Sequence, residues 1–208
     1  MATKKATVKP SAPRSLAKPY SWILTIGGSA GLIASFILTL DKIEKLKNPS
    51  FQPNCDINPI VSCGDVLSSS QGSVFGFPNS LIGMAMFAAL AAIGIALLAG
   101  AKFRRWFWLG LWGGMVVGIV FAFWMLEQSI YSINALCPYC LSVDVATITI
   151  FWYSTLYLLE TKILVVPKSW NTAVGFVRKH HLDFLIGIFL IIIAVILKHF
   201  WYYYGQKL

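Results

Sequence analysis

The chain has 208 residues, of which 57% are hydrophobic and 12% charged, and its mean hydropathy is +0.70. These values exclude a soluble domain of this size and indicate an integral membrane protein. A net charge of +9 would suggest nucleic-acid binding if the basic residues formed one face, but here they fall between apolar runs. We therefore expect membrane lipid, and no nucleic acid, as a partner.

Five apolar stretches are long enough to cross a membrane, because a helix needs about 20 mainly apolar residues to span the hydrocarbon core. Three of them contain no charge, and the other two carry charges near their ends. An odd number of spans places the two termini on opposite sides. The predicted spans are residues 20–40, 79–101, 106–126, 141–159 and 182–204.

The basic residues predict the orientation of these spans. If the N-terminus lies inside, 12 of the 17 Lys and Arg residues fall on the inner side and five on the outer side. Basic residues favour the cytoplasmic side, so we expect a cytoplasmic N-terminus and an outward-facing loop at 41–78. Residues 1–19 are expected to be a disordered cytoplasmic tail, 161–181 a cytoplasmic connector, and 182–208 a fifth transmembrane helix with a short tail.

The loop at 41–78 holds the first cysteine pair, Cys55 and Cys63. Outside the cytoplasm such a pair is most often a disulfide that only stiffens a loop, and considered alone it favours that interpretation. The segment Val66–Ser70 is predicted to form a short helix lying on the membrane.

The second pair opens the fourth span with the sequence Cys137-Pro138-Tyr139-Cys140. A Cys-x-x-Cys motif at a helix N-terminus favours redox exchange, because the helix dipole stabilises the thiolate. Pro138 suits the first helical turn. The alternatives are a structural clip or half of a zinc site, but no histidine lies near either pair in sequence, so we expect no metal.

Both pairs are predicted on the outer side, which permits a thiol relay from a soluble dithiol to the second pair. Because the sequence carries no flavin, haem or nicotinamide motif, a membrane quinone is the expected electron acceptor. Asn79, which follows Pro78 at the start of the second span, either donates a hydrogen bond to a quinone oxygen or caps the helix. Asp144, one turn beyond Cys140, either handles protons or regulates the Cys140 thiol, or reaches the outer membrane boundary.

Glycines are frequent in the first and third spans. Gly27, Gly28 and Gly31 in the first, and Gly110, Gly114 and others in the third, predict close helix packing.

The ordered set of motifs resembles the vitamin K epoxide reductase family over about residues 20–160. The residues that carry this resemblance are the two cysteines separated by seven residues, Ser68 and Ser69 after them, Asn79, Ser80 and Gly83 at the second span, and Cys137 and Cys140 opening the fourth. The resemblance implies an all-α integral membrane fold, with a four-helix bundle around a quinone and a fifth, peripheral helix.

The resemblance also implies roles for individual residues. Cys140 lies next to the quinone and attacks it, Cys137 exchanges with the loop through Cys63, and Cys55 meets the external thiol. Asn79 corresponds to the residue that hydrogen-bonds the quinone. Leu67 and Ser69 match positions that close the pocket and hold the loop.

One position departs from the family pattern. Vertebrate relatives have Thr-Tyr-Ala where this chain has Val143-Asp144-Val145, so the tyrosine that contacts the quinone and coumarin drugs is missing. We expect weak sensitivity to coumarins.

Within the family, the fifth helix and the Cys-Pro-Tyr-Cys sequence favour a role in forming disulfides in exported proteins at a bacterial plasma membrane. The expected enzyme is a quinone-dependent thiol:disulfide oxidoreductase that uses menaquinone or ubiquinone and a separate thioredoxin-fold partner outside the cytoplasm. Three alternatives remain. The first is a vitamin K epoxide or quinone reductase. The second is an unrelated type of periplasmic disulfide oxidase, which carries its Cys-x-x-Cys motif in the first outer loop, the reverse of the order in this chain. The third is a non-catalytic membrane protein with structural disulfides.

Overall fold

The computed structural model describes residues 17–204, and within this range every named element is helical. Five of these helices are long and apolar enough to cross a membrane, which confirms an all-α, multi-pass membrane protein. They are α1 (Ala17–Lys47), α3 (Asn79–Leu98), α4 (Arg105–Gln128), α5 (Pro138–Glu160) and α7 (His181–Tyr204). The predictions for residues 1–16 and 205–208 lie outside the described residues.

Short helices connect the spans. They are α2 (Cys63–Ser68), the 3-10 turns η1 (Ser70–Ser73) and η3 (Lys168–Trp170), the π-helical turn η2 (Ser129–Ile133), and α6 (Asn171–Lys179). The first span is longer than its apolar core: helix formers occupy residues 41–47, so α1 continues to Lys47 and the loop begins at Asn48.

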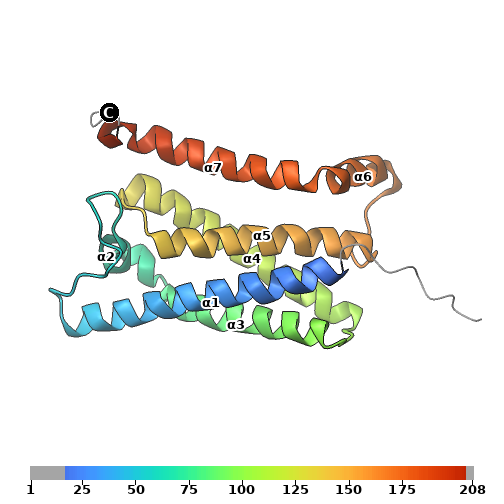
Figure 1. Cartoon of the computed structure of the whole chain (residues 1–208), viewed down its shortest axis with the longest axis horizontal. Helices are drawn as coiled ribbons and strands as arrows, with labels where there is room; N and C mark the ends of the chain where they lie inside the picture. The colour runs from blue at the N-terminus through green and yellow to red at the C-terminus, as the bar shows by residue number, and fades with distance from the viewer. Residues whose placement is uncertain (1–16, 205–208) are drawn as a thin grey trace, which may run out of the picture.

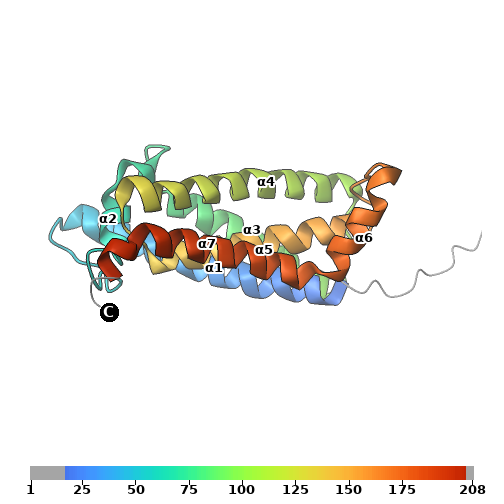
Figure 2. The same ribbon diagram turned by 90° about the horizontal axis from the view of Figure 1, so that it is seen from above.

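Four helices form the bundle, and the fifth lies outside it. Helix α1 packs against α3 and α5, and α4 packs against α5, whereas α7 runs along the outside (Figures 1 and 2). Helix α2 lies at one end of the bundle, here called the cysteine end, together with the C-terminal end of α7. Helix α6 and the start of α1 lie at the opposite end. This arrangement confirms the predicted four-helix bundle with a peripheral fifth helix.

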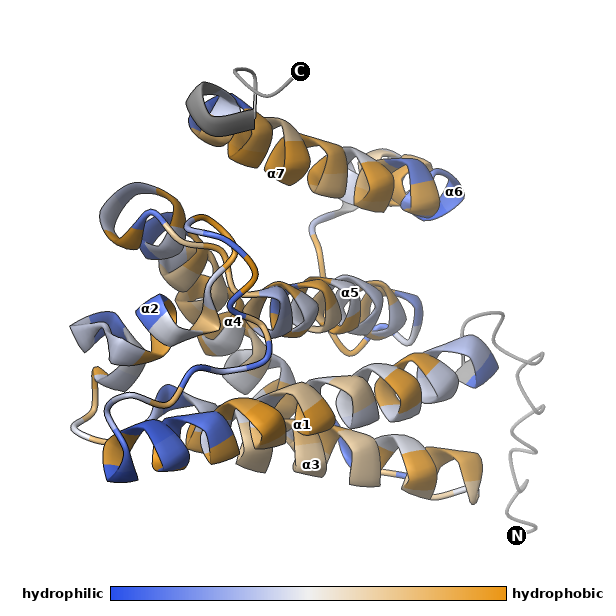
Figure 3. Ribbon diagram, turned by 60° about the vertical axis from the view of Figure 1, so that its left-hand side comes forward, coloured by the Kyte–Doolittle hydropathy of each residue, from blue (hydrophilic) through white to orange (hydrophobic). Residues whose placement is uncertain are grey.

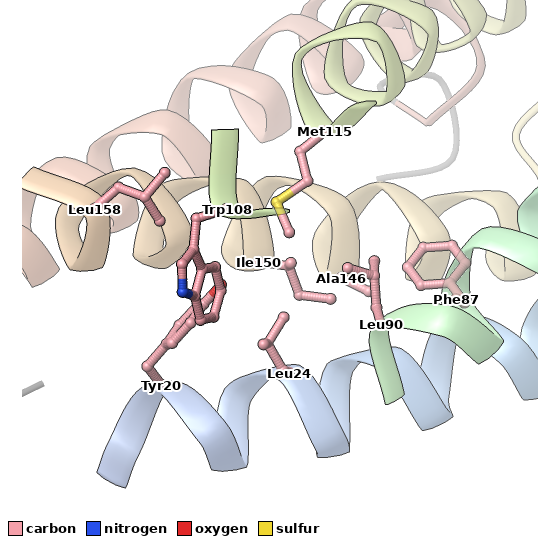
Figure 4. Close-up of a cluster of buried hydrophobic side chains, with 9 residues drawn as sticks. All are labelled: Tyr20, Leu24, Phe87, Leu90, Trp108, Met115, Ala146, Ile150 and Leu158. Carbon is pink, nitrogen blue, oxygen red and sulfur yellow. The ribbon is translucent and has the colours of Figure 1, made fainter. Parts of the chain in front are cut away.

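The main core lies between α1, α3, α4 and α5 (Figure 4). Tyr20 of α1 stacks on Tyr157 of α5 with ring centroids 4.5 Å apart, and its hydroxyl lies 3.0 Å from the Ser154 hydroxyl. The outer surfaces of the spans remain apolar, most clearly along α7 (Figure 3), as expected for helices that face lipid. The buried residues of this cluster are Tyr20, Leu24, Phe87, Leu90, Trp108, Met115, Ala146, Ile150 and Leu158.

The glycines of the first span pack as predicted, but those of the third do not. A Cβ on Gly28 would lie 2.6 Å from the Ala91 backbone nitrogen of α3, so only glycine permits this approach. By contrast, a Cβ on Gly110 or Gly118 of α4 would meet nothing within 4 Å. The packing prediction for α4 is therefore wrong, because these glycines line a cavity instead.

Candidate functional site: two cysteine pairs beside an apolar cavity

Cys55 and Cys63 form a disulfide, with their Cα atoms 5.7 Å apart. Cys63 is the first residue of α2, and the preceding Ser62 caps this helix by accepting a hydrogen bond from the Asp65 N–H at 3.1 Å. The Asp56 carboxylate accepts a 2.8 Å bond from the Gly64 N–H. The cap explains why the short helix begins at Cys63. The helix ends at Ser68, so the predicted range Val66–Ser70 was wrong at both ends.

The second pair lies at the N-terminus of α5, as the sequence indicated. Cys137 is the N-cap, Pro138 occupies the first helical turn, and the Cys140 N–H donates to Cys137 Sγ at 3.3 Å. Both thiols are free, Cys137 fully buried and Cys140 partly buried. A sulfur at an N-cap receives a hydrogen bond and the partial positive charge of the helix, and both favour its thiolate form.

A parallel β-bridge between Val61 and Leu136 brings the two pairs together. The Leu136 N–H donates to the Ile60 carbonyl at 2.6 Å, and the Ser62 N–H donates to the Leu136 carbonyl at 3.0 Å. Along the chain, Cys137 directly follows Leu136, and Cys63 comes two residues after Val61. Their sulfur atoms lie 3.2 Å apart, close enough for one to attack the other.

The turn before Cys137 sets the position of the bridge. After the π-helical turn, Asn134 takes a left-handed conformation with φ 56°, which asparagine tolerates better than most residues. The Ser129 hydroxyl donates to the Ala135 carbonyl, and the Ala135 N–H donates back to the Ser129 carbonyl at 3.2 Å. The chain thereby reverses direction and leads Leu136 into the bridge.

Hydrogen bonding lowers the pKa of Cys137, which lies between two membrane spans. The Cys140 thiol is the largest influence; burial acts in the opposite direction, and the backbone N–H groups of Cys140 and Tyr139 add to the lowering. A lowered pKa means that Cys137 is the better thiolate at the place where it contacts Cys63.

A cavity of about 390 Å³ lies inside the bundle, and Cys137 and Cys140 line it at the cysteine end. Most of its walls are apolar side chains, with few polar groups among them. Gly110, Gly114 and Gly118 form one wall at a spacing of four residues, which places them on one face of α4. The opposite wall comes from α3, which has no extensive backbone contact with α4 in the described chain. This separation leaves room for an apolar ligand.

Asn79 lines the cavity as the first residue of α3, and it makes no side-chain capping bond. Its amide donates to the Gln71 carbonyl at 2.6 Å, and its Oδ1 accepts from the Val74 N–H at 3.2 Å. The amide nitrogen also contacts Met125 Sδ at 3.9 Å, a weak partner. One N–H of Asn79 can therefore still be offered to a ligand oxygen.

Leu67 and Ser69 have different positions around the cavity. Leu67 lines it, whereas Ser69 does not line it and holds the loop. The Ser69 hydroxyl donates to the Val66 carbonyl at 2.7 Å and accepts from the Gly72 N–H at 3.1 Å.

Lys42 makes a contact that the sequence did not predict, because its ammonium donates to the Leu67 carbonyl at the C-terminal end of α2. The lysines in the last turns of α1 are visible in the sequence, but they were used only to predict the orientation of the spans in the membrane.

Asp144 also lines the cavity, one helical turn beyond Cys140. Within residues 17–204 its carboxyl group makes no hydrogen bond or ion pair. Placing an acidic group among apolar walls and thiols costs free energy, so such residues are rare and commonly mark functional sites. The structure thus places Asp144 in the cavity beside Cys140.

The fold and site together define a membrane protein with a redox-active cysteine centre. A helical bundle crosses the bilayer, and two cysteine pairs meet at one end of an apolar cavity. The sequence model described as the Vitamin K epoxide reductase family matches residues 22–155, about two thirds of the chain. The chain belongs to this family and is a membrane oxidoreductase. No curated protein matches it.

Proposed function

We propose that this protein passes electrons from an external dithiol, through its two cysteine pairs, to a membrane quinone. The contact of 3.2 Å between Cys63 and Cys137 carries the proposal, because it joins the loop pair to the pair that lines the cavity. A purely structural role for the disulfide would need no free thiol at this distance.

The exchange between the pairs conserves electrons and bonds. When the loop pair is reduced, the Cys63 thiolate attacks Cys137 of a Cys137–Cys140 disulfide, forming a Cys63–Cys137 bond and releasing Cys140. Cys55 then attacks Cys63, restoring the loop disulfide and releasing Cys137. Two electrons have moved to the pair beside the cavity, and one disulfide remains throughout.

The cavity fits a quinone head group and its tail. A bound quinone supplies an acceptor for two electrons and two protons. Cys137 and Cys140 give up two electrons and two protons and close to a disulfide, and the Asn79 amide offers a hydrogen bond to an oxygen that gains negative charge. Asp144 carries a proton between Cys140 and that oxygen. The glycine wall of α4 accommodates the apolar tail.

The external thiol is proposed to be a separate thioredoxin-fold protein that attacks Cys55. The Cys55 side chain is only 6% exposed, so the partner must displace part of the loop around it. The neighbouring Ile57 is 72% exposed and offers an apolar contact beside the disulfide. Docking on Ile57 is a physical means of opening this loop.

The cysteine end is proposed to face the outside of a bacterial plasma membrane, with the opposite end in the cytoplasm. The basic residues before α4 and around α6 lie at the opposite end, which supports this orientation by the positive-inside rule. An oxidising outer compartment lets electrons leave exported proteins and lets their disulfides persist. The proposed role is therefore disulfide formation in exported proteins, with menaquinone or ubiquinone as acceptor.

Dithiol-driven quinone reduction by the purified protein in lipid nanodiscs tests this function. A reduced thioredoxin-fold protein is expected to support quinol formation, and Cys140→Ala is expected to abolish it. Cys63→Ser is expected to trap a mixed disulfide between Cys55 and the partner. If alkylation finds Cys55 and Cys63 never reduced by any dithiol, the disulfide is structural and the proposal fails. Conversion of vitamin K epoxide in place of quinone would favour the epoxide reductase.

A further inference from the structure

The last turns of α7 contact the part of the bundle that holds the cysteines. Most of α7 presents exposed apolar side chains, such as Leu190 at 60% and Ile191 at 66% exposure. Phe200 differs, since it is fully buried, while the next residue, Trp201, is 62% exposed. One aromatic ring of this outer helix is therefore inserted into the protein at the cysteine end.

The neighbours of Phe200 include residues at the β-bridge. It belongs to a buried cluster with Ile60, Leu136, Leu126 and Ile130. Ile60 and Leu136 are the two residues joined by the 2.6 Å backbone hydrogen bond of the bridge. Phe200 therefore packs behind the bond that aligns the two cysteine-bearing segments.

A second contact holds the same turn of α7 to the segment before Cys137. His199 Nε2 lies 2.9 Å from Oδ1 of Asn134, to which it donates, and its imidazole meets the Tyr131 ring edge-on with centroids 5.0 Å apart. Asn134 is the left-handed residue that ends the π-helical turn. Two adjacent residues of α7, whose rings also contact each other, thus hold the turn and the bridge.

We propose that the C-terminal end of α7 is a positioning element for thiol exchange, with Phe200 as its main residue. Phe200 supports Ile60 and Leu136 from behind and so keeps Cys63 within reach of Cys137. This inference rests on the proposed function, in which these two sulfurs exchange. It assigns the fifth helix a role in the reaction beyond anchoring the chain in the membrane.

The test measures how closely Cys63 and Cys137 are held together, without using quinone or partner. In the double variant Cys55→Ser/Cys140→Ser, the two remaining cysteines can pair only with each other. Equilibration of the full chain in nanodiscs with glutathione buffers gives their effective concentration. Adding Phe200→Ala is expected to lower it on the order of tenfold or more, since small displacements of reacting groups have large effects. Trp201→Ala, the adjacent exposed aromatic, is the control and should leave it unchanged.

Two further variants keep the test decisive if Phe200→Ala does not fold. Phe200→Leu retains apolar bulk and should reduce the effective concentration less than alanine. His199→Ala removes the bond to Asn134 together with the ring contacts to Tyr131 and Phe200, and should reduce the effective concentration by a few fold. If none of the folded variants differs from Trp201→Ala, the positioning role is refuted. That result leaves the quinone reaction untouched, because dithiol-driven quinol formation is measured separately.

Discussion

Replacing Gly114 with leucine is expected to block the cavity while leaving the cysteine pairs in place. Gly114 lies in the middle of the glycine wall of α4, and a Cβ there would meet only the end of Met86, at 3.8 Å. The added side chain can therefore enter the cavity without disturbing the backbone. Four added carbon atoms occupy about 100 Å³. The cavity measures about 390 Å³, so a substantial part of it would be filled.

The expected result is a rise in the quinone KM of about tenfold or more, equivalent to about 1.4 kcal/mol of lost binding. Cys137 lines the cavity at its cysteine end, and Cys63, which it contacts, does not line the cavity, so thiol exchange between them should continue at its normal rate. Quinol formation is followed by absorbance in nanodiscs at several quinone concentrations. Alkylation of the cysteines after addition of a dithiol reports the exchange.

The matched control is Gly113→Leu. Gly113 is the preceding residue, is exposed and does not line the cavity, and a Cβ there would meet nothing within 4 Å. The same side chain should therefore point towards lipid and leave the KM unchanged. If both variants raise the KM equally, or neither does, the acceptor does not bind along the glycine wall, and our reasoning about α4 is refuted.

Four other outcomes are expected. Asp144→Asn should slow quinol formation by about 100-fold or more, the lower end of the range of general acid–base catalysis, while exchange between the cysteine pairs continues; equal slowing of both steps would contradict a proton-carrying role. Gly28→Ala should destabilise the protein by roughly 1–3 kcal/mol, because its Cβ would lie 2.6 Å from the Ala91 nitrogen, and a thermal or denaturant unfolding curve compared with that of Gly113→Ala checks this. Hydrogen bonding lowers the pKa of Cys137, so this thiol should remain a thiolate, and react with alkylating reagents, at a lower pH than an ordinary thiol. Its alkylation should be lost only as the pH falls through the lowered pKa. The pH profile of an ordinary thiol would show that the hydrogen bonds do not lower the pKa. Coumarins should inhibit quinol formation only weakly, since the resemblance implies that vertebrate relatives carry a tyrosine at the position of Asp144, and strong inhibition at low drug concentration would contradict this.

The sequence was sufficient for the helices but not for how some of their faces are used. Hydropathy identified all five spans. Charged side chains are costly in lipid and backbone groups there must be paired within a helix, so a span is a long run of apolar residues that the sequence shows directly. Both helices are rich in glycine, but the glycines of α1 pack against neighbouring helices whereas Gly110, Gly114 and Gly118 of α4 line a cavity. Whether a small residue is covered depends on where the next helix lies, which local sequence does not contain.

The cysteines illustrate the same division. Their sequence indicated a redox motif at a helix N-terminus, since Pro138 and the two-residue spacing are local properties, and the structure confirms that helix start. The pairing of Cys63 with Cys137 came only from family resemblance. The structure supports it through a β-bridge between residues that are far apart in the chain.

By itself, then, the sequence determined a five-span membrane protein with two cysteine pairs at one end, because hydrophobicity, charge and helix capping act over a few residues. The tertiary structure decided which sulfur meets which, where the cavity opens, and that Phe200 of the outer helix packs behind the bridge. These are contacts between distant segments, and their geometry follows from how the helices pack together.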